Sequence, residues 1–114
     1  MINDLLKKVC VSCEGKGIKP FDKDQVEGYM VQVSSWILSE DIKKISKEFK
    51  FKDFIGAINF VNGVSEIAES EGHHPDIYIR YNKVLLELST HAIGGLSEND
   101  FILAAKINAH NKFN

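Results

Sequence analysis

The sequence predicts a single α+β domain in which helices and antiparallel hairpins follow one another in the order α-β-β-α-β-β-α. Three segments carry apolar residues at helical spacing, and two segments show apolar residues alternating with polar ones on both sides of a short turn. The length of 114 residues, of which 44% are hydrophobic and 26% charged, fits one globular domain. We expect residues 1–20 to form an N-terminal arm and residues 21–114 to form the domain.

The first helix is expected at about residues 23–33. Asp22 and Gln25 have the spacing of a capping box, in which each residue's side chain bonds the other's backbone N–H. Val26 and Val33 fall on one face of the helix that follows. A first hairpin comes next, with a short apolar run at residues 36–38 and an alternating pattern over residues 45–51.

The second helix is expected from about residue 53 to residue 71. Its apolar residues recur at helical spacing, and Gly72 followed by Pro75 stops the pattern. Gly56 and Gly63 lower the helix propensity of this segment, which indicates close packing against a neighbouring element.

Residues 77–88 form a second hairpin pattern, with apolar and polar residues alternating on both sides of Asn82 and Lys83. If these two residues are the turn, the ladder brings His74 opposite His91. Pro75 interrupts that ladder, yet the histidines remain near one end of the hairpin in either case, so their proximity is the firmer expectation.

The last helix is expected to open at Ser97, because Asp100 follows at capping-box spacing and residues 101–108 continue the helical pattern. Helix capping explains Asp100 without any catalytic role, and we favour that interpretation from the residues alone. His110, near the polar end of the chain, is expected to be solvated.

Three of the four histidines, His73, His74 and His91, are expected together, with Glu69 one helical turn before His73. Zinc ligation is disfavoured, because adjacent histidines on irregular backbone do not readily point at one ion. His73 and His74 also suit a helix C-terminus, where cationic side chains are favourable. Proton transfer is the leading hypothesis, because His91 is remote in sequence and two imidazoles that titrate near neutrality serve as acid and base.

Composition and charge argue against several classes of partner. The formal charge is −2, and the charged residues are spread along the chain. This pattern lacks the cluster of charges that indicates binding to nucleic acid or to a lipid surface. The apolar residues within 2–6 are too few for a signal peptide or a membrane span, so we expect a cytoplasmic protein. Cys10 and Cys13 are interpreted as ordinary thiols, because one CxxC is at most half of a zinc site.

Two ordered strings, FKFKDFIGAINFVNGVSEIAE and EGHHPDIYIRYNKVLLELSTHAIGGLSENDFILAAKI, carry a family resemblance. They contain a Glu four residues before His-His-Pro, a Tyr-Asn-Lys-Val hairpin, a Ser-Thr-His, and a Gly-Leu-Ser-x-x-Asp that opens a helix. Residues 36–108 thereby resemble the pterin-4a-carbinolamine dehydratases, also called 4a-hydroxytetrahydrobiopterin dehydratases. The lead-in KKVCVSCEGKGIKP is similar to the bacterial and plant-type members. Ile77 departs from the pattern, because some members have Trp there, and this affects a stacking contact.

The resemblance implies a four-stranded antiparallel sheet with three helices on one face, assembled into homodimers or homotetramers. It also implies elimination of water from a 4a-hydroxytetrahydropterin to give the quinonoid dihydropterin, which recycles the cofactor of aromatic amino acid hydroxylases. Neither a metal nor an organic cofactor is implied. Because some relatives act as a dimerisation cofactor or look like assembly proteins, a noncatalytic binding or regulatory module is the alternative.

The resemblance also implies roles for individual residues. His73 and His91 share the acid and base roles, with the order open. A substrate-binding role is implied for Glu69, His74 and Asp100, and for the strand-end backbone of Ser89 and Thr90. Histidine suits this chemistry, because hydroxide leaves poorly until an acid protonates it while a base removes the proton from N5.

Overall fold

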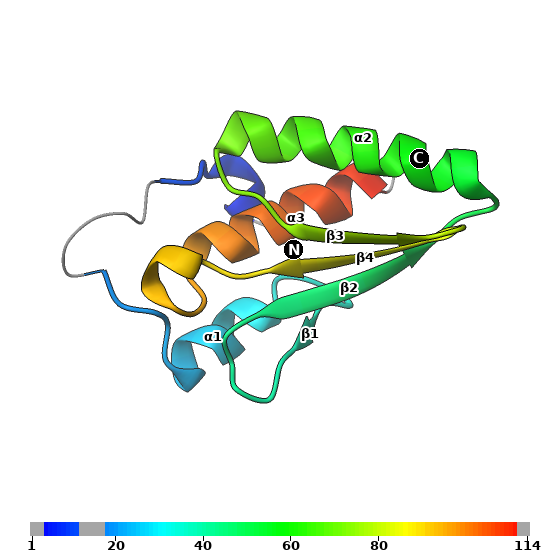
Figure 1. The fold of residues 1–114 in the computed structure, drawn as a ribbon. Coiled ribbons are helices and arrows are strands. Elements are labelled where there is room, and N and C mark those ends of the chain that lie inside the picture. The colour runs from blue at the N-terminus through cyan, green and yellow to red at the C-terminus, as the bar shows by residue number, and fades with distance from the viewer. Residues whose placement is uncertain (1–3, 12–17, 112–114) are drawn as a thin grey trace.

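The computed structural model describes residues 4–11 and 18–111, and its elements follow the predicted order (Figure 1). The helices are α1 (Lys23–Met30), α2 (Phe54–Glu71) and α3 (Glu98–Asn111), and the strands are β1 (Ile37–Leu38), β2 (Ile45–Lys50), β3 (Asp76–Arg80) and β4 (Lys83–Leu88). Short 3-10 helices precede α1 and follow β4, namely η1 (Asp4–Lys7) and η2 (His91–Ile93). The predicted α+β class is therefore confirmed.

The four strands form one antiparallel sheet in the spatial order β1-β2-β4-β3. The central strands β2 and β4 are far apart in sequence, yet they pair from Ile45↔Leu88 to Lys50↔Lys83. The three helices cover one face of this sheet, as expected, and α2 and α3 pack against each other (Figure 1). The ends of α2 and β4 and the start of α3 consequently meet at one edge of the molecule.

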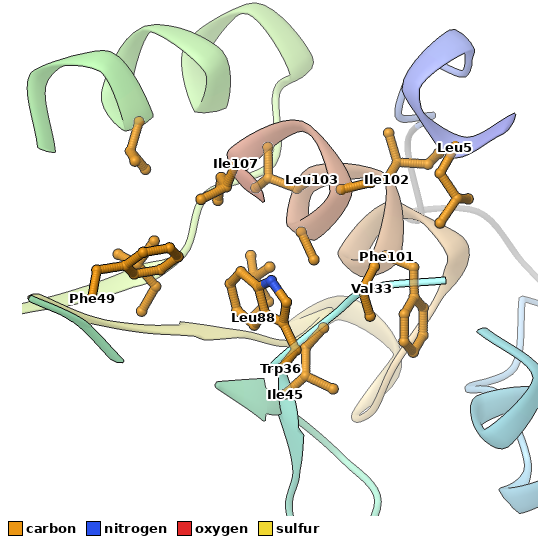
Figure 2. Packing of buried hydrophobic residues seen from close by; sticks show 14 of the residues in the cluster. Leu5, Val33, Trp36, Ile45, Phe49, Leu88, Phe101, Ile102, Leu103 and Ile107 are labelled. Atoms are coloured by element: carbon orange, nitrogen blue, oxygen red, sulfur yellow. The ribbon is translucent and has the colours of Figure 1, made fainter. Parts of the chain in front are cut away.

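The hydrophobic core lies between the sheet and the helices (Figure 2). Alternate residues of the central strands point into it and are buried, namely Ile45, Phe49, Val84, Leu86 and Leu88. Eight of the fourteen residues of α3 are buried, so this helix is enclosed on most of its sides. Burial at this level holds the first turn of α3, which carries Asp100, in a fixed position.

The first helix begins as predicted but ends earlier. The capping box is present, because the Asp22 side chain accepts from Gln25 N–H at 2.9 Å and the Gln25 side chain accepts from Asp22 N–H at 3.0 Å. Regular helix ends at Met30 instead of near residue 33. Turns follow until Ser35, whose φ of 68° lies in the left-handed region that a right-handed helix excludes.

The second helix has the predicted bounds, with the Asp53 side chain capping its start through Gly56 N–H at 2.8 Å. Its close packing is also confirmed, because a Cβ at Gly63 would overlap the ring of His110 on α3. That ring also stacks on Phe60 with centroids 5.8 Å apart. The expectation that His110 is solvated is therefore wrong: its ring fills the space that the glycine leaves.

The second hairpin exists, but its register differs from the predicted one. Arg80 pairs with Lys83, so the turn is Tyr81 and Asn82, and Tyr81 has a left-handed φ of 52°. A shift of two residues keeps every side chain on its own face, so the apolar pattern does not distinguish the two registers. Contacts outside the hairpin favour the observed one, because Asn82 exchanges hydrogen bonds with Phe51 after β2.

Part of the N-terminal arm packs against the domain. Leu5 of η1 is 1% exposed and lies beside Ile102 of α3 (Figure 2). Lys8 forms an ion pair of 2.7 Å with Glu98. Among the residues that the structure describes, no helix combines the length and the apolar character needed to cross a bilayer.

Candidate active site

A cleft of about 480 Å³ opens between the end of α2, the segment after β4 and the N-terminal arm. His73, His74 and His91 all line it, together with Ser89 and Thr90. The volume falls within the range of small-molecule pockets, about 300–1,000 Å³. The predicted gathering of the three imidazoles is observed, although they meet in a cleft and not as a facing pair in the hairpin ladder.

His73 is placed by the way α2 ends. Gly72 adopts the left-handed conformation with φ 66°, which glycine reaches without a Cβ clash. The N–H of His73 then donates back to the carbonyl oxygen of Ala68 at 3.3 Å. The His73 side chain is only 12% exposed, and its Nε2 lies 2.6 Å from Oδ1 of Asp100. His73 therefore joins the end of α2 to the start of α3.

Asp100 lies behind His73, is completely buried, and has three hydrogen-bond partners. Besides His73, its carboxylate accepts from the Thr90 hydroxyl at 2.8 Å and from Ser97 N–H at 3.0 Å. The Ser97 bond is one half of the predicted capping box. These hydrogen bonds offset part of the hydration that a fully buried carboxyl group loses. Asp100 thus caps α3 and also orients His73, so capping alone does not describe it.

His74 and Glu69 form a second pair at the rim. Nε2 of His74 lies 2.9 Å from Oε1 of Glu69, one turn back along α2. Their side chains are 56% and 79% exposed, so solvent screens this pair. Glu69 does not line the cleft itself but contacts His74, which does. The partner of His73, Asp100, is by contrast buried.

His91 starts η2, which follows β4 after Ser89 and Thr90. The turn is closed at its base, because Thr90 N–H donates to the carbonyl oxygen of Gly95 at 2.8 Å. Gly94 has a left-handed φ of 71°, and its N–H donates to the His91 carbonyl oxygen. The Thr90 backbone N–H expected to contact substrate is thus bonded within the turn, and the Thr90 side chain is bonded to Asp100. Thr90 positions both His91 and Asp100.

Sequence reasoning missed the part of the cleft wall formed by the arm. Cys10 and Val11 line the cleft, as do Glu71 and Asn99, which bond to them. Burial opposes ionisation of Glu71, but hydrogen bonds from Lys106 and from the Cys10 backbone outweigh it and lower the pKa of this carboxyl. The available signal was a carboxylate next to the helix-ending glycine, in the string EGHHP.

The thiol of Cys10 is half-buried beside Glu71. Burial, followed by the negative charge of Glu71, raises the pKa of this thiol to about 12. At neutral pH the thiol is therefore protonated and supplies no base. Cys13 lies outside the described residues, and within those residues no group of three or more His, Cys, Asp or Glu side chains is arranged to hold a metal ion.

A cleft lined by several imidazoles, one of them held by a buried carboxylate, is typical of an enzyme that moves protons. Comparison with known proteins specifies the class. The family model described as pterin 4 alpha carbinolamine dehydratase matches residues 19–110, and the chain belongs to that family. The expected family is confirmed, and with it the enzyme class of the hydro-lyases.

Individual relatives agree with this assignment. The chain is 50% identical to a protein of Halorhodospira halophila named as a pterin-4-alpha-carbinolamine dehydratase, over 92% of this chain and 95% of that protein. It is 44% identical to the mitochondrial pterin-4-alpha-carbinolamine dehydratase 2 of Arabidopsis thaliana, over 92% of this chain and 58% of the plant protein.

Solved structures share the fold. A crystal structure from Brucella melitensis, described as a transcriptional coactivator/pterin dehydratase, superposes with a TM-score of 0.76 at 31% identity, over 80% of this chain and 97% of that one. A pterin dehydratase-like protein identified as a RuBisCO assembly factor superposes with a TM-score of 0.58 at 24% identity, over 66% of this chain and 87% of that one. The second likeness concerns the fold alone.

Proposed function

We propose that the protein dehydrates 4a-hydroxytetrahydropterins to quinonoid dihydropterins by histidine acid–base catalysis. The observation that carries the proposal is the meeting of three imidazoles in one cleft of about 480 Å³, with His73 held by the buried Asp100. A cleft of this size suits a bicyclic heterocycle.

The reaction breaks one C–O bond and one N–H bond. An acid protonates the 4a-hydroxyl oxygen, which leaves C4a as water, while a base takes the N5 proton. The electron pair of the N5–H bond then forms the double bond between N5 and C4a. Imidazole suits both roles, because its unperturbed pKa of about 6.5 lies near neutrality.

We assign the two proton transfers to His73 and His91, which reach the cleft from different elements. If Asp100 is ionised, Nε2 of His73 is the donor in their hydrogen bond, and Nδ1 of the neutral ring is the proton acceptor. His74, fixed by Glu69, binds the substrate from the rim. Ser89 lines the cleft and is the better candidate for contact with the pyrimidinone edge, because Thr90 is bonded within the turn.

The cellular role belongs to the same proposal. The product returns to the tetrahydrobiopterin pool, so an aromatic amino acid hydroxylase is the expected source of substrate. We expect the protein to be cytoplasmic and, as the resemblance implies, a homodimer or homotetramer, and light scattering of the purified protein measures its mass. The alternative of a noncatalytic binding module gives no reason for Glu69, His73, His74 and His91 to lie together.

The test is direct. A hydroxylase generates the 4a-hydroxypterin, and its absorbance decay is followed with and without the purified protein. We expect faster decay with the protein, and loss of at least a hundredfold of kcat in His73→Ala/His91→Ala, because general acid–base groups contribute about 10²–10⁴-fold. His110 does not line the cleft, so His110→Ala serves as the histidine control. Decay unaffected by the protein, or by the double substitution, contradicts the proposal.

A further inference from the structure

We propose that Cys10 and Val11 of the arm form a substrate-contacting wall of the cleft, and that Glu71 and Asn99 are positioning residues that hold this wall in place. The inference rests on the proposed function, because its ligand is the pterin of that reaction. We call residues 10–11 the arm wall.

The arm wall is bonded to the domain through backbone groups of both residues. Cys10 N–H donates to Oε1 of Glu71 at 2.8 Å, and Val11 N–H donates to Oδ1 of Asn99 at 3.0 Å. The Asn99 side-chain N–H donates in turn to the Val11 carbonyl oxygen. Asn99 therefore pairs with both backbone groups of Val11, much as a neighbouring strand does.

Both positioning residues are nearly buried, so undocking of the arm wall has a cost. Asn99 is 5% exposed, and the Glu71 side chain is 9% exposed and bonded to Lys106 at 2.6 Å. Buried polar groups that lose their partners are strongly unfavourable. Because Glu71 ends α2 beside the glycine that precedes His73, the same carboxylate links the arm wall to the histidine side of the cleft.

The arm wall can contact the substrate but supplies no group that transfers a proton. The Val11 side chain is apolar and exposed, and it lines the cleft that the imidazoles share. The Cys10 thiol is neutral at working pH, as its burial beside Glu71 requires. Contacts of this kind bind substrate and transition state about equally, so their loss raises KM and leaves kcat nearly unchanged.

Two valines of the arm provide a matched experiment. Val9 and Val11 are both 67% exposed, but only Val11 is among the residues lining the cleft. We expect Val11→Ser to raise KM for the 4a-hydroxytetrahydropterin about fivefold with kcat changed less than twofold, and Val9→Ser to change neither. Equal KM values for the two variants, or a loss confined to kcat in Val11→Ser, overturn the inference.

A second measurement does not depend on turnover. In a Cys13→Ser background Cys10 is the remaining thiol of the chain, and its labelling by N-ethylmaleimide reports access to the arm wall. We expect 7,8-dihydrobiopterin, a stable pterin, to slow this labelling at least threefold. Asn99→Asp, which places a carboxylate against the Val11 carbonyl oxygen, is expected to speed labelling and to raise KM as Val11→Ser does.

The outcomes separate the two proposals. If the wild-type protein does not accelerate dehydration, the proposed function fails, whatever the labelling shows. A different result is that the wild-type protein accelerates dehydration, but the dihydropterin leaves Cys10 labelling unchanged and Val11→Ser has the wild-type KM. The arm wall then does not contact substrate, and the proposed function stands.

Discussion

Replacement of Asp100 by asparagine tests the link between the buried carboxylate and His73. The two side chains have the same shape, so packing is preserved, but an amide has one acceptor oxygen and one donor nitrogen. If Asp100 is ionised, both of its oxygens are acceptors, one for Nε2 of His73 and the other for Ser97 N–H and the Thr90 hydroxyl. Whichever way the amide is turned, its NH₂ group meets a donor.

The size of the effect follows from that conflict. If the NH₂ group faces His73, Nε2 must become an acceptor and the ring proton moves to Nδ1, which is the opposite tautomer. A wrong tautomer at an acid–base residue costs about 10²–10⁴ in kcat. If the NH₂ group faces Ser97 instead, a buried N–H loses its acceptor, at about 1–3 kcal/mol of unfolding free energy. We expect Asp100→Asn to lose either at least a hundredfold in kcat or about 2 kcal/mol in stability, according to the side that the NH₂ group faces.

The assay combines stopped-flow dehydration kinetics with urea unfolding, and ¹⁵N NMR of the imidazoles reports the His73 tautomer directly. Glu69→Gln is the matched control, because it changes the exposed carboxylate of the other Glu/Asp–His pair and is expected to alter stability by less than about 0.5 kcal/mol. An Asp100→Asn protein with wild-type kcat, an unchanged tautomer and wild-type stability would refute the reasoning.

Two further predictions concern stability. The pKa of Glu71 lies below its ordinary 4.5, so its ion pair stabilises fully above that pH, and this stabilisation is lost as pH falls through the lowered value. In a plot of the urea unfolding midpoint against pH, Glu71→Gln should therefore reduce the slope on the acid side. Gly63→Ala should destabilise the protein by about 1 kcal/mol, because the new methyl group displaces His110 from Phe60. In a His110→Ala background, Gly63→Ala should stabilise the protein by about 1 kcal/mol, because alanine has the higher helix propensity. Thermal unfolding measures both effects, and the same sign in both backgrounds would contradict the packing argument.

Local signals in the sequence were sufficient for the element order and most helix ends. Asp22 and Asp53 cap the first two helices, and Gly72 ends the second, because each acts on backbone within a few residues. The hairpin register was not predictable in this way. The two candidate registers bury the same faces, and the choice depends on the contact between Asn82 and Phe51, which are far apart in sequence.

The candidate site was predictable to a similar extent. The meeting of His73, His74 and His91 followed from a hairpin that returns the chain to its starting end, and a register error of two residues did not disturb it. The contact between His73 and Asp100 joins the ends of two helices by their tertiary packing, which no periodicity encodes. The part played by the arm depends in the same way on where Asn99 lies after folding.

The pairing of β2 with β4 has a consequence for synthesis on the ribosome. Ile45 and Phe49 of β2 meet their partners Leu88 and Val84 only after the whole of α2 and β3 has emerged. A nascent chain that ends before β4 leaves one edge of β2 unpaired and its apolar side chains uncovered, which is the kind of surface that chaperones bind. The middle of the sheet thus closes late, and the cleft, which also needs α3, is completed after it.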